Sequence, residues 1–208
     1  YHDTMAELDA HFAAHPYLLG GAPTIGDYGL FAALYPHLGR DPHPLRLMQG
    51  KAQMLLRWTE RMRNPSSDMV EFIGRDESLL GDDAIPKTLK VLLARVASDY
   101  LPEIEAMTAF SNDWLAENNP EPNEVVGGES LARGIGMCEF NWRGLNINTV
   151  VMPYRIFMLQ RIQDAYDALE VPAREAVDAL LSETGLSTLV TSRCSRRVER
   201  ENHREIWR

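Results

Sequence analysis

The chain of 208 residues has 45% hydrophobic and 25% charged residues, which is typical of a globular protein with one core, or one core and an extension. Its net charge of −9 disfavours non-specific binding to nucleic acid, and no apolar run has the length that a membrane span requires. The two cysteines form neither a disulfide framework nor a zinc-binding spacing, and no secretory signal pattern is present, so we expect a protein of the reducing cytoplasm that holds no metal.

The first predicted element is a helix over residues 4–14, which ends before Pro16. The chain opens at Tyr1 without a methionine, while this helical pattern is already under way. We therefore expect a fragment of a longer protein, in which the face of Leu8 and Phe12 lacks its usual partner. A stand-alone domain is the alternative.

Two histidines of this helix, His11 and His15, are four residues apart, a spacing that can bind a metal ion. No third ligand is evident in the sequence, so we expect a partly exposed pair instead. His37 and His43 flank proline-rich turns without a visible partner, which is typical of surface or hydrogen-bonded histidines.

Thr24 and Asp27 stand three residues apart at the start of an apolar run. This spacing predicts a capping box, in which Thr24 accepts from the backbone N–H of residue 27 and the Asp27 carboxylate accepts from the N–H of Thr24. Asp27 also places negative charge at the positive end of the helix dipole. Gly20, Gly21 and Pro23 end the preceding helix. We expect this pair to be a structural helix cap rather than a catalytic group.

Residues 25–38 are predicted to form a buried helix, because they are apolar on more than one face. A loop over residues 39–44 follows, and apolar residues at helical spacing predict a single helix over residues 45–63. The turn-forming residues 64–68 then mark a first candidate boundary.

The second block of helices is predicted from prolines at first helical positions. One helix is expected to begin at Pro86 and another at Pro102, before a polar loop over residues 117–124. Further helices are expected to begin at Pro153 and Pro172.

Between these helices, apolar residues recur at every second position instead of at helical spacing. Residues 138–142 alternate between apolar and polar side chains, which predicts a half-buried strand. Gly144 and Asn146 are expected to turn the chain, and residues 148–151 to return it as a hairpin.

Trp142, Arg143, Tyr154 and Arg155 are the candidate substrate-binding residues. They combine two aromatic rings and two cations in the region where the period changes, and sites for apolar ligands use a few polar groups of this kind. The alternative is that the rings pack in the core and the arginine stems lie along apolar surface.

The remaining candidates have structural interpretations. Cys138 is expected to be a small buried hydrophobe, and Cys194 lies near arginines that would lower its thiol pKa, although we assign it no catalytic role. Neither Gly20–Gly21 nor Gly127–Gly128 has the context of a phosphate-binding loop. Arginines that alternate with glutamates at the C-terminus predict a salt-bridged exposed face, with an anion-binding tail as the alternative. These arginines are Arg193, Arg196, Arg197, Arg200, Arg204 and Arg208.

The stretch Pro16–Phe31 resembles the central helix of the C-terminal domain of glutathione S-transferases. Residues 8–12 are similar to the end of that family's preceding helix, and residues 44–62 with Pro65 are similar to the following one. The resemblance covers residues 5–65. The positions that carry it are Tyr17, Leu18, Gly20, Gly21, Pro23, Thr24, Ile25, Asp27, Tyr28 and Phe31.

The resemblance implies a mainly α fold, namely a helical bundle of this type extended by helices and one hairpin. It also implies a thioredoxin-like domain, absent from this chain, that binds glutathione as co-substrate and lowers its thiol pKa. The parent protein would then transfer glutathione to a small hydrophobic electrophile, and this chain alone would be inactive. The alternative function is a non-catalytic helical interaction or dimerisation module, and a homodimer remains open under either.

The expected division has three parts. Residues 1–65 carry the transferase-like helices, residues 66–130 a helical extension and polar loop, and residues 131–208 the hairpin and C-terminal helices on the same core.

Overall fold

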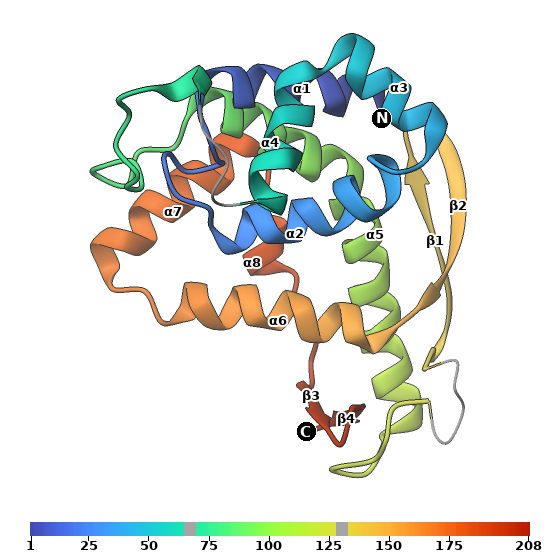
Figure 1. Cartoon of the computed structure of the whole chain (residues 1–208). Coiled ribbons are helices and arrows are strands. Elements are labelled where there is room, and N and C mark those ends of the chain that lie inside the picture. Colours follow the sequence, from blue (N-terminus) through green and yellow to red (C-terminus); the bar gives the residue numbers. More distant parts are fainter. Residues whose placement is uncertain (65–69, 128–132) are drawn as a thin grey trace. The chain divides into compact units, whose positions relative to one another are not determined.

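The computed structural model describes residues 1–64, 70–127 and 133–208, and it is mainly helical with short antiparallel hairpins, which confirms the predicted fold class (Figure 1). No helix in these ranges is both long and apolar enough to cross a lipid bilayer. The elements are α1 (His2–Ala14), α2 (Ile25–Ala33), the π-helix η1 (Leu34–Leu38), α3 (Pro42–Lys51), α4 (Gln53–Arg63), the 3₁₀ turn η2 (Val70–Phe72), α5 (Lys87–Asn118), β1 (Gly136–Trp142), β2 (Leu145–Val151), α6 (Pro153–Asp167), α7 (Val171–Thr184), α8 (Thr188–Thr191), β3 (Val198–Glu201) and β4 (Arg204–Trp207).

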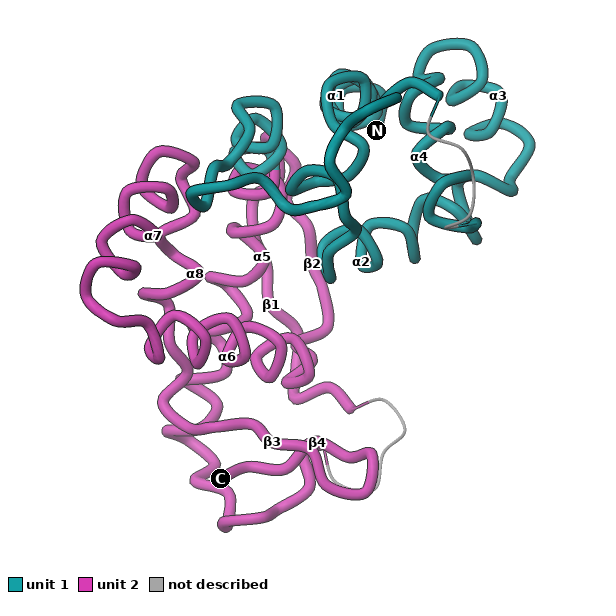
Figure 2. The backbone as a smooth tube through the Cα atoms, turned by 60° about the vertical axis from the view of Figure 1, so that its left-hand side comes forward, with its two compact units in different colours: residues 1–95 teal, residues 96–208 magenta. Residues whose placement is uncertain are grey.

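The chain divides into two compact units, residues 1–95 and residues 96–208, which Figure 2 shows in different colours. The division falls inside α5, so the first turns of this helix belong to unit 1 and the rest to unit 2. The three-part division expected from the sequence stays a prediction. Pro65, at the expected end of the transferase-like helices, lies outside the described residues.

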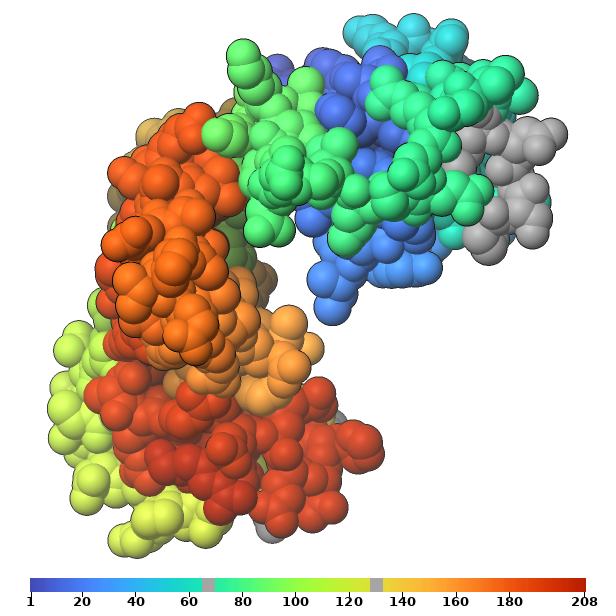
Figure 3. Space-filling view, turned by 90° about the vertical axis from the view of Figure 1, so that its left-hand side faces the viewer, coloured from blue at the N-terminus to red at the C-terminus, as the bar shows by residue number. Residues whose placement is uncertain are grey.

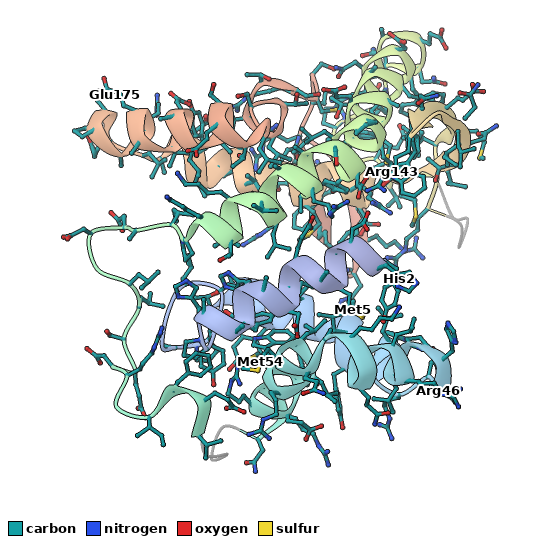
Figure 4. The ribbon with its side chains drawn as sticks, turned by 90° about the horizontal axis from the view of Figure 1, so that it is seen from above. His2, Met5, Arg46, Met54, Arg143 and Glu175 are labelled. Atoms are coloured by element: carbon teal, nitrogen blue, oxygen red, sulfur yellow. The ribbon has the colours of Figure 1, made fainter. Side chains whose placement is uncertain are left out.

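Unit 1 is built around α4, which contacts α1, α2 and α3. Figure 4 labels Met5 of α1 and Met54 of α4, which belong to the same hydrophobic cluster. Leu8 and Phe12 are buried, and the Phe12 ring stacks on Trp58 of α4 with 4.6 Å between ring centroids. The expectation that this face lacks a partner is therefore wrong, because α4 covers it.

The predicted single helix over residues 45–63 is two helices, α3 and α4, separated by the buried Ala52. Alanine has no side-chain acceptor for the free N–H groups of a helix start. The Asp9 carboxylate of α1 supplies it instead, accepting from the backbone N–H of Met54 at 2.7 Å and of Leu55 at 3.0 Å. A cap from 45 positions away in the chain is invisible to local sequence patterns.

The predicted buried helix over residues 25–38 is also different in the structure. It becomes a π-helix from Leu34 onward, where Pro36 has no N–H for the regular ladder. The outer face of α2, formed by Ile25, Tyr28, Gly29 and Ala32, is exposed: Ile25 retains 91% of its accessible surface and Tyr28 58%. Figure 3 shows α2 at the surface of unit 1. An uncharged helix face that is exposed is unusual, because such faces are normally buried.

The prediction that the double glycine ends the preceding helix is wrong, because α1 already ends at Ala14, and the glycines have another role in the loop before α2. Gly21 donates its N–H to the carbonyl of Ser78 at 2.8 Å, and the N–H of Leu80 donates to the carbonyl of Leu19 at 2.9 Å. A Cβ on Gly21 would lie 1.9 Å from the carbonyl oxygen of Asp76. The glycines thus permit a close approach of two backbone segments.

Unit 2 packs around the long helix α5. The prediction that a new helix begins at Pro102 is wrong, since Pro102 lies inside α5. Leu101 and Ile104 are buried on either side of it, so tertiary packing overrides the local cost of the proline. The second core contains Met107, Leu115, Val126, Cys138, Val151, Ile156, Val198 and Trp207.

The hairpin β1–β2 confirms the predicted change of period. Its turn residues are Arg143 and Gly144, both with positive φ, rather than Gly144 and Asn146. A second hairpin, β3–β4, turns at Asn202 and His203 in the same conformation. The sequence pattern does not predict this hairpin, because its short strands are dominated by charged side chains.

Candidate functional site

The carboxylate of Asp27 is fully buried and accepts four hydrogen bonds. The backbone N–H and the hydroxyl of Thr24 both donate to Oδ2 at 2.9 Å, and both arms of a capping box are present. The backbone N–H of Leu18 donates to Oδ1 at 3.0 Å, and the indole N–H of Trp58 donates to the same oxygen at 3.2 Å. Asp27 therefore joins the start of α2 to the preceding loop and to α4.

The surroundings of this carboxylate indicate a structural role rather than a catalytic one. All four donors come from the protein, and the carboxylate has no surface open to a substrate. The Trp58 ring that donates to it is enclosed by Phe12 and, edge-on at 6.3 Å, by Phe31. The sequence pattern shows the Thr24 contact, whereas the contacts with Leu18 and Trp58 require the fold.

His11 is fully buried, so the expected partly exposed pair is wrong for this residue. Its Nδ1 lies 2.8 Å from the hydroxyl of Thr88, and its Nε2 lies 3.3 Å from the carbonyl oxygen of Tyr17. Burial lowers the pKa of both His11 and His15. Within the described ranges, no group of three or more histidine, cysteine or acidic side chains is placed to hold a metal ion.

The two arginines among the candidate substrate-binding residues are engaged in ion pairs on one face of α5. Arg143 forms a bidentate pair with Asp99 at 2.7 and 2.8 Å. Arg155 donates to Glu103, one turn further along α5, at 3.0 Å. These pairs hold the tip of β1–β2 and the start of α6 against α5.

The two candidate aromatic residues lie at opposite ends of the hairpin. Trp142 pairs with Leu145 beside the turn, whereas Tyr154 follows the end of β2 at Val151. Six residues of strand separate these ends, or about 20 Å. Tyr154 is flanked by the Phe157 ring and by the guanidinium of Arg200. The structure thus brings the two arginines toward one helix face and keeps the two aromatic rings apart.

Neither thiol has the environment of a nucleophile. Cys138 is buried in β1 as expected, and burial raises its pKa. Burial also raises the pKa of Cys194, so the expected lowering by neighbouring arginines is wrong. The neighbouring arginines point instead to carboxylates: Arg193 pairs with Asp167 at 2.6 Å and Arg197 with Asp164 at 2.7 Å. These contacts agree with the predicted salt-bridged C-terminal face.

A cavity of unit 1 lies between η1, α3 and α4 and is not anticipated from the sequence. It has a volume of about 630 Å³ and is open to solvent. Arg40, Arg57 and Arg63 line it together with the Tyr35 ring, and we call it the arginine cleft. Its remaining lining residues are Gly39, Leu45, Gln49, Leu56, Thr59 and Glu60.

A sequence signal for the arginine cleft exists. Residues 35–63 contain six lysines and arginines against two acidic residues, whereas the whole chain contains 21 against 30. This local excess of positive charge is masked in the composition of the whole chain, and the cleft itself appears only when α3 folds beside α4.

The comparison with protein families finds a similarity in the first part of the chain. Residues 1–61 match the family model "Glutathione S-transferase, C-terminal domain". No curated protein and no solved structure matches the chain. The match covers α1 to α4 as far as Arg61, and it includes the capping box, Asp9 and Trp58.

Proposed function

We propose, because residues 1–61 match the family model of the glutathione S-transferase C-terminal domain, that this chain is the helical part of an enzyme that transfers glutathione to a small hydrophobic electrophile. In such a reaction the glutathione sulfur forms a bond to an electrophilic carbon, the leaving group departs with its electron pair, and the thiol proton passes to a base. A thioredoxin-like domain of the parent protein would bind glutathione and activate its thiol.

The observation that supports this proposal is the outer face of α2. Ile25, Tyr28, Gly29 and Ala32 present no charge, and Ile25 and Tyr28 are largely exposed. An uncharged exposed face fits a surface that a further part of an enzyme, or an apolar substrate, covers. The helix behind this face is fixed by Asp27, so the face is rigidly presented.

The properties of the two cysteines are consistent with a reaction in which this chain supplies no reactive thiol. Burial raises the pKa of both thiols, which disfavours the thiolate form that acts as a nucleophile. The reactive sulfur would therefore come from glutathione. Trp142, Arg143, Tyr154 and Arg155 stay proposed as substrate contacts, and their ion pairs with α5 give the two arginines a structural role as well.

A calorimetric titration with glutathione tests whether glutathione binding requires the further domain of the parent protein. We expect no measurable heat with residues 1–208 and saturable binding with the parent protein, defined as the longest reading frame that contains this sequence. Tight glutathione binding by residues 1–208 alone would contradict the proposal, as would a parent protein that does not bind glutathione.

A second candidate function is a non-catalytic helical interaction or dimerisation module, which the same outer face of α2 supports. Sedimentation of the parent protein with and without Ile25→Asp distinguishes the two. In the module, one added charge on this face would dissociate an oligomer while glutathione binding was absent throughout. In the enzyme, glutathione binding is present irrespective of oligomeric state.

A further inference from the structure

A second cavity of unit 1 lies where the end of α1 and the double glycine meet residues 75–81, and we call it the loop cavity. Its volume of about 260 Å³ is below the range of sites for drug-sized molecules, so it suits a ligand of few heavy atoms. Residues 75–81 lie beyond the match to the family model, so the family pattern does not account for this cavity. The lining residues are His15, Pro16, Gly20, Gly21, Arg75, Asp76, Ser78, Leu79, Leu80 and Gly81.

Backbone hydrogen bonds fix the walls of the loop cavity. The bonds from Gly21 to Ser78 and from Leu80 to Leu19 lie on either side of an isolated antiparallel bridge between Gly20 and Leu79. The cavity is therefore formed before a ligand binds, which reduces the free energy spent on ordering the site.

Arg75 supplies a positive charge that is held in place. Its Nη1 donates to the carbonyl oxygen of Ala14 at 2.7 Å, and its guanidinium lies 5.3 Å from the centroid of the Phe72 ring. The other N–H groups of this guanidinium have no acceptor among the described residues. Burial and the charge of Arg75 lower the pKa of His15, so this ring adds no second positive charge near neutral pH.

Asp76 supplies a negative charge at the next position. Within the part of the chain that the structure describes, its carboxylate forms no ion pair, not even with its neighbour Arg75. An anion in the cavity would be repelled by Asp76, and an amine would be repelled by Arg75. A ligand that carries both charges satisfies the two side chains together.

The size of the cavity lets one small zwitterion reach both side chains. A sphere of the same volume is about 8 Å across. The charged groups of an α-amino acid are about 3 Å apart, and a hydrogen bond of about 2.8 Å at each end gives nearly the same span.

We propose that the loop cavity binds a free α-amino acid with a small apolar side chain. Arg75 holds the α-carboxylate and Asp76 holds the ammonium group, both through charge-assisted hydrogen bonds. The apolar side chain lies against Leu79 and Leu80, which line the same cavity. This binding is independent of glutathione transfer, because every lining residue belongs to unit 1 of this chain.

The test is a calorimetric titration of residues 1–208 with L-valine at neutral pH. Two control ligands have the same carbon skeleton, namely 3-methylbutanoate, which lacks the ammonium group, and isobutylamine, which lacks the carboxylate. We expect L-valine to bind at least about tenfold more tightly than either control, because each control loses one charge-assisted hydrogen bond and meets one repelling side chain.

Variants locate the site. Arg75→Gln and Asp76→Asn should each weaken L-valine binding by about tenfold, and Asp76→Asn should at the same time strengthen binding of 3-methylbutanoate, because the repelling carboxylate is gone. Glu77→Gln is the matched control, since Glu77 is an exposed carboxylate at the next position that does not line the cavity. Thermal unfolding checks the fold of each variant, and Asp76→Asn decides if Arg75→Gln does not fold.

Three results would overturn the proposal. The first is the absence of saturable heat with L-valine. The second is binding of 3-methylbutanoate or isobutylamine as tight as that of L-valine, which would show that only one charge is recognised. The third is an equal loss of affinity in Glu77→Gln and Asp76→Asn, which would indicate an effect of net charge rather than a contact in the cavity.

Discussion

At the scale of single residues, the carboxylate of Asp27 links three segments of unit 1 through its hydrogen bonds. A buried carboxylate is costly unless donors satisfy it, and here four donors from three segments do so. Removing the carboxylate would leave the indole N–H of Trp58 and the backbone N–H groups of Leu18 and Thr24 without this partner. The cost should therefore exceed that of losing a simple helix cap.

We predict that Asp27→Ala lowers the free energy of unfolding by about 3 kcal/mol or more, because several buried donors lose their acceptor together. Thr24→Ala removes only the hydroxyl arm and should cost about 1 kcal/mol. Urea denaturation followed by circular dichroism measures both. Equal losses in the two variants would show that the contacts of Asp27 with Leu18 and Trp58 contribute nothing.

His11 should make stability depend on pH. Burial lowers its pKa below the ordinary value of 6.5, so the unfolded chain takes up a proton at a pH where the folded chain does not. Stability is therefore lost as pH falls below about 6.5, the ordinary pKa of histidine. His15, whose ring centroid lies 5.2 Å away, and the nearby Asp27 share this environment.

The measurement is the urea midpoint at about pH 7.5 and about pH 5.5, on either side of the histidine pKa. We predict a smaller loss on acidification in His11→Gln than in the unmodified chain, because glutamine does not titrate while His15 and Asp27 are retained. Identical losses in the two proteins would contradict the assignment of His11 as a buried neutral histidine.

At the scale of elements, the sequence predicts what is local and misses what is distant. The capping spacing of Thr24 and Asp27 and the alternation of β1 are local, and both elements are where the patterns place them. The break between α3 and α4 depends on Asp9 of α1, and the continuation of α5 through Pro102 depends on packing on both sides. No window of neighbouring residues contains these contacts.

The contacts of the candidate substrate-binding residues also come from distant parts of the sequence, which local patterns do not show. Arg143 lies over the Trp142 ring in the fold, as its position in the sequence suggests. The ion pairs of Arg143 and Arg155 with carboxylates of α5 are not visible in the sequence. The arginine cleft escapes sequence-based prediction because its lining comes from three separate elements. The charge excess of residues 35–63 is visible in the sequence, but its concave arrangement is not.

Substitutions at two glycines of unit 1 test whether the double glycine allows a close approach of two backbone segments. We predict that Gly21→Ala destabilises the protein by about 2 kcal/mol or more, because the new Cβ would meet the carbonyl of Asp76, as overpacking does elsewhere. Gly29→Ala is the matched control: it lies in α2, and a methyl group added there would meet no atom within 4 Å. It should stabilise by about 0.5–1 kcal/mol.

Thermal and urea unfolding of these two glycine variants give the comparison. Opposite signs support the close approach of residues 76–80 to the double glycine. A neutral Gly21→Ala would contradict it, because the two backbone segments would then be separable without loss.

At the scale of the whole molecule, the match to a known family and the division into units are separate facts. The match ends at residue 61, inside unit 1, whereas unit 1 extends to residue 95 through η2 and the first turns of α5. The part of unit 1 beyond the match supplies Thr88 to His11 and the segment that packs on the double glycine. The transferase-like helices thus have contacts within this chain that the family pattern does not predict.

The central claim is that these helices belong to a glutathione-transferring enzyme, and the rate of glutathione conjugation to chlorodinitrobenzene tests it most directly. We predict a rate above the uncatalysed reaction with the parent protein, none with residues 1–208, and a reduced rate with the parent protein carrying Ile25→Asp, which charges the outer face of α2. A parent protein that conjugates none of a panel of electrophiles, or a rate with residues 1–208 alone, would contradict the account.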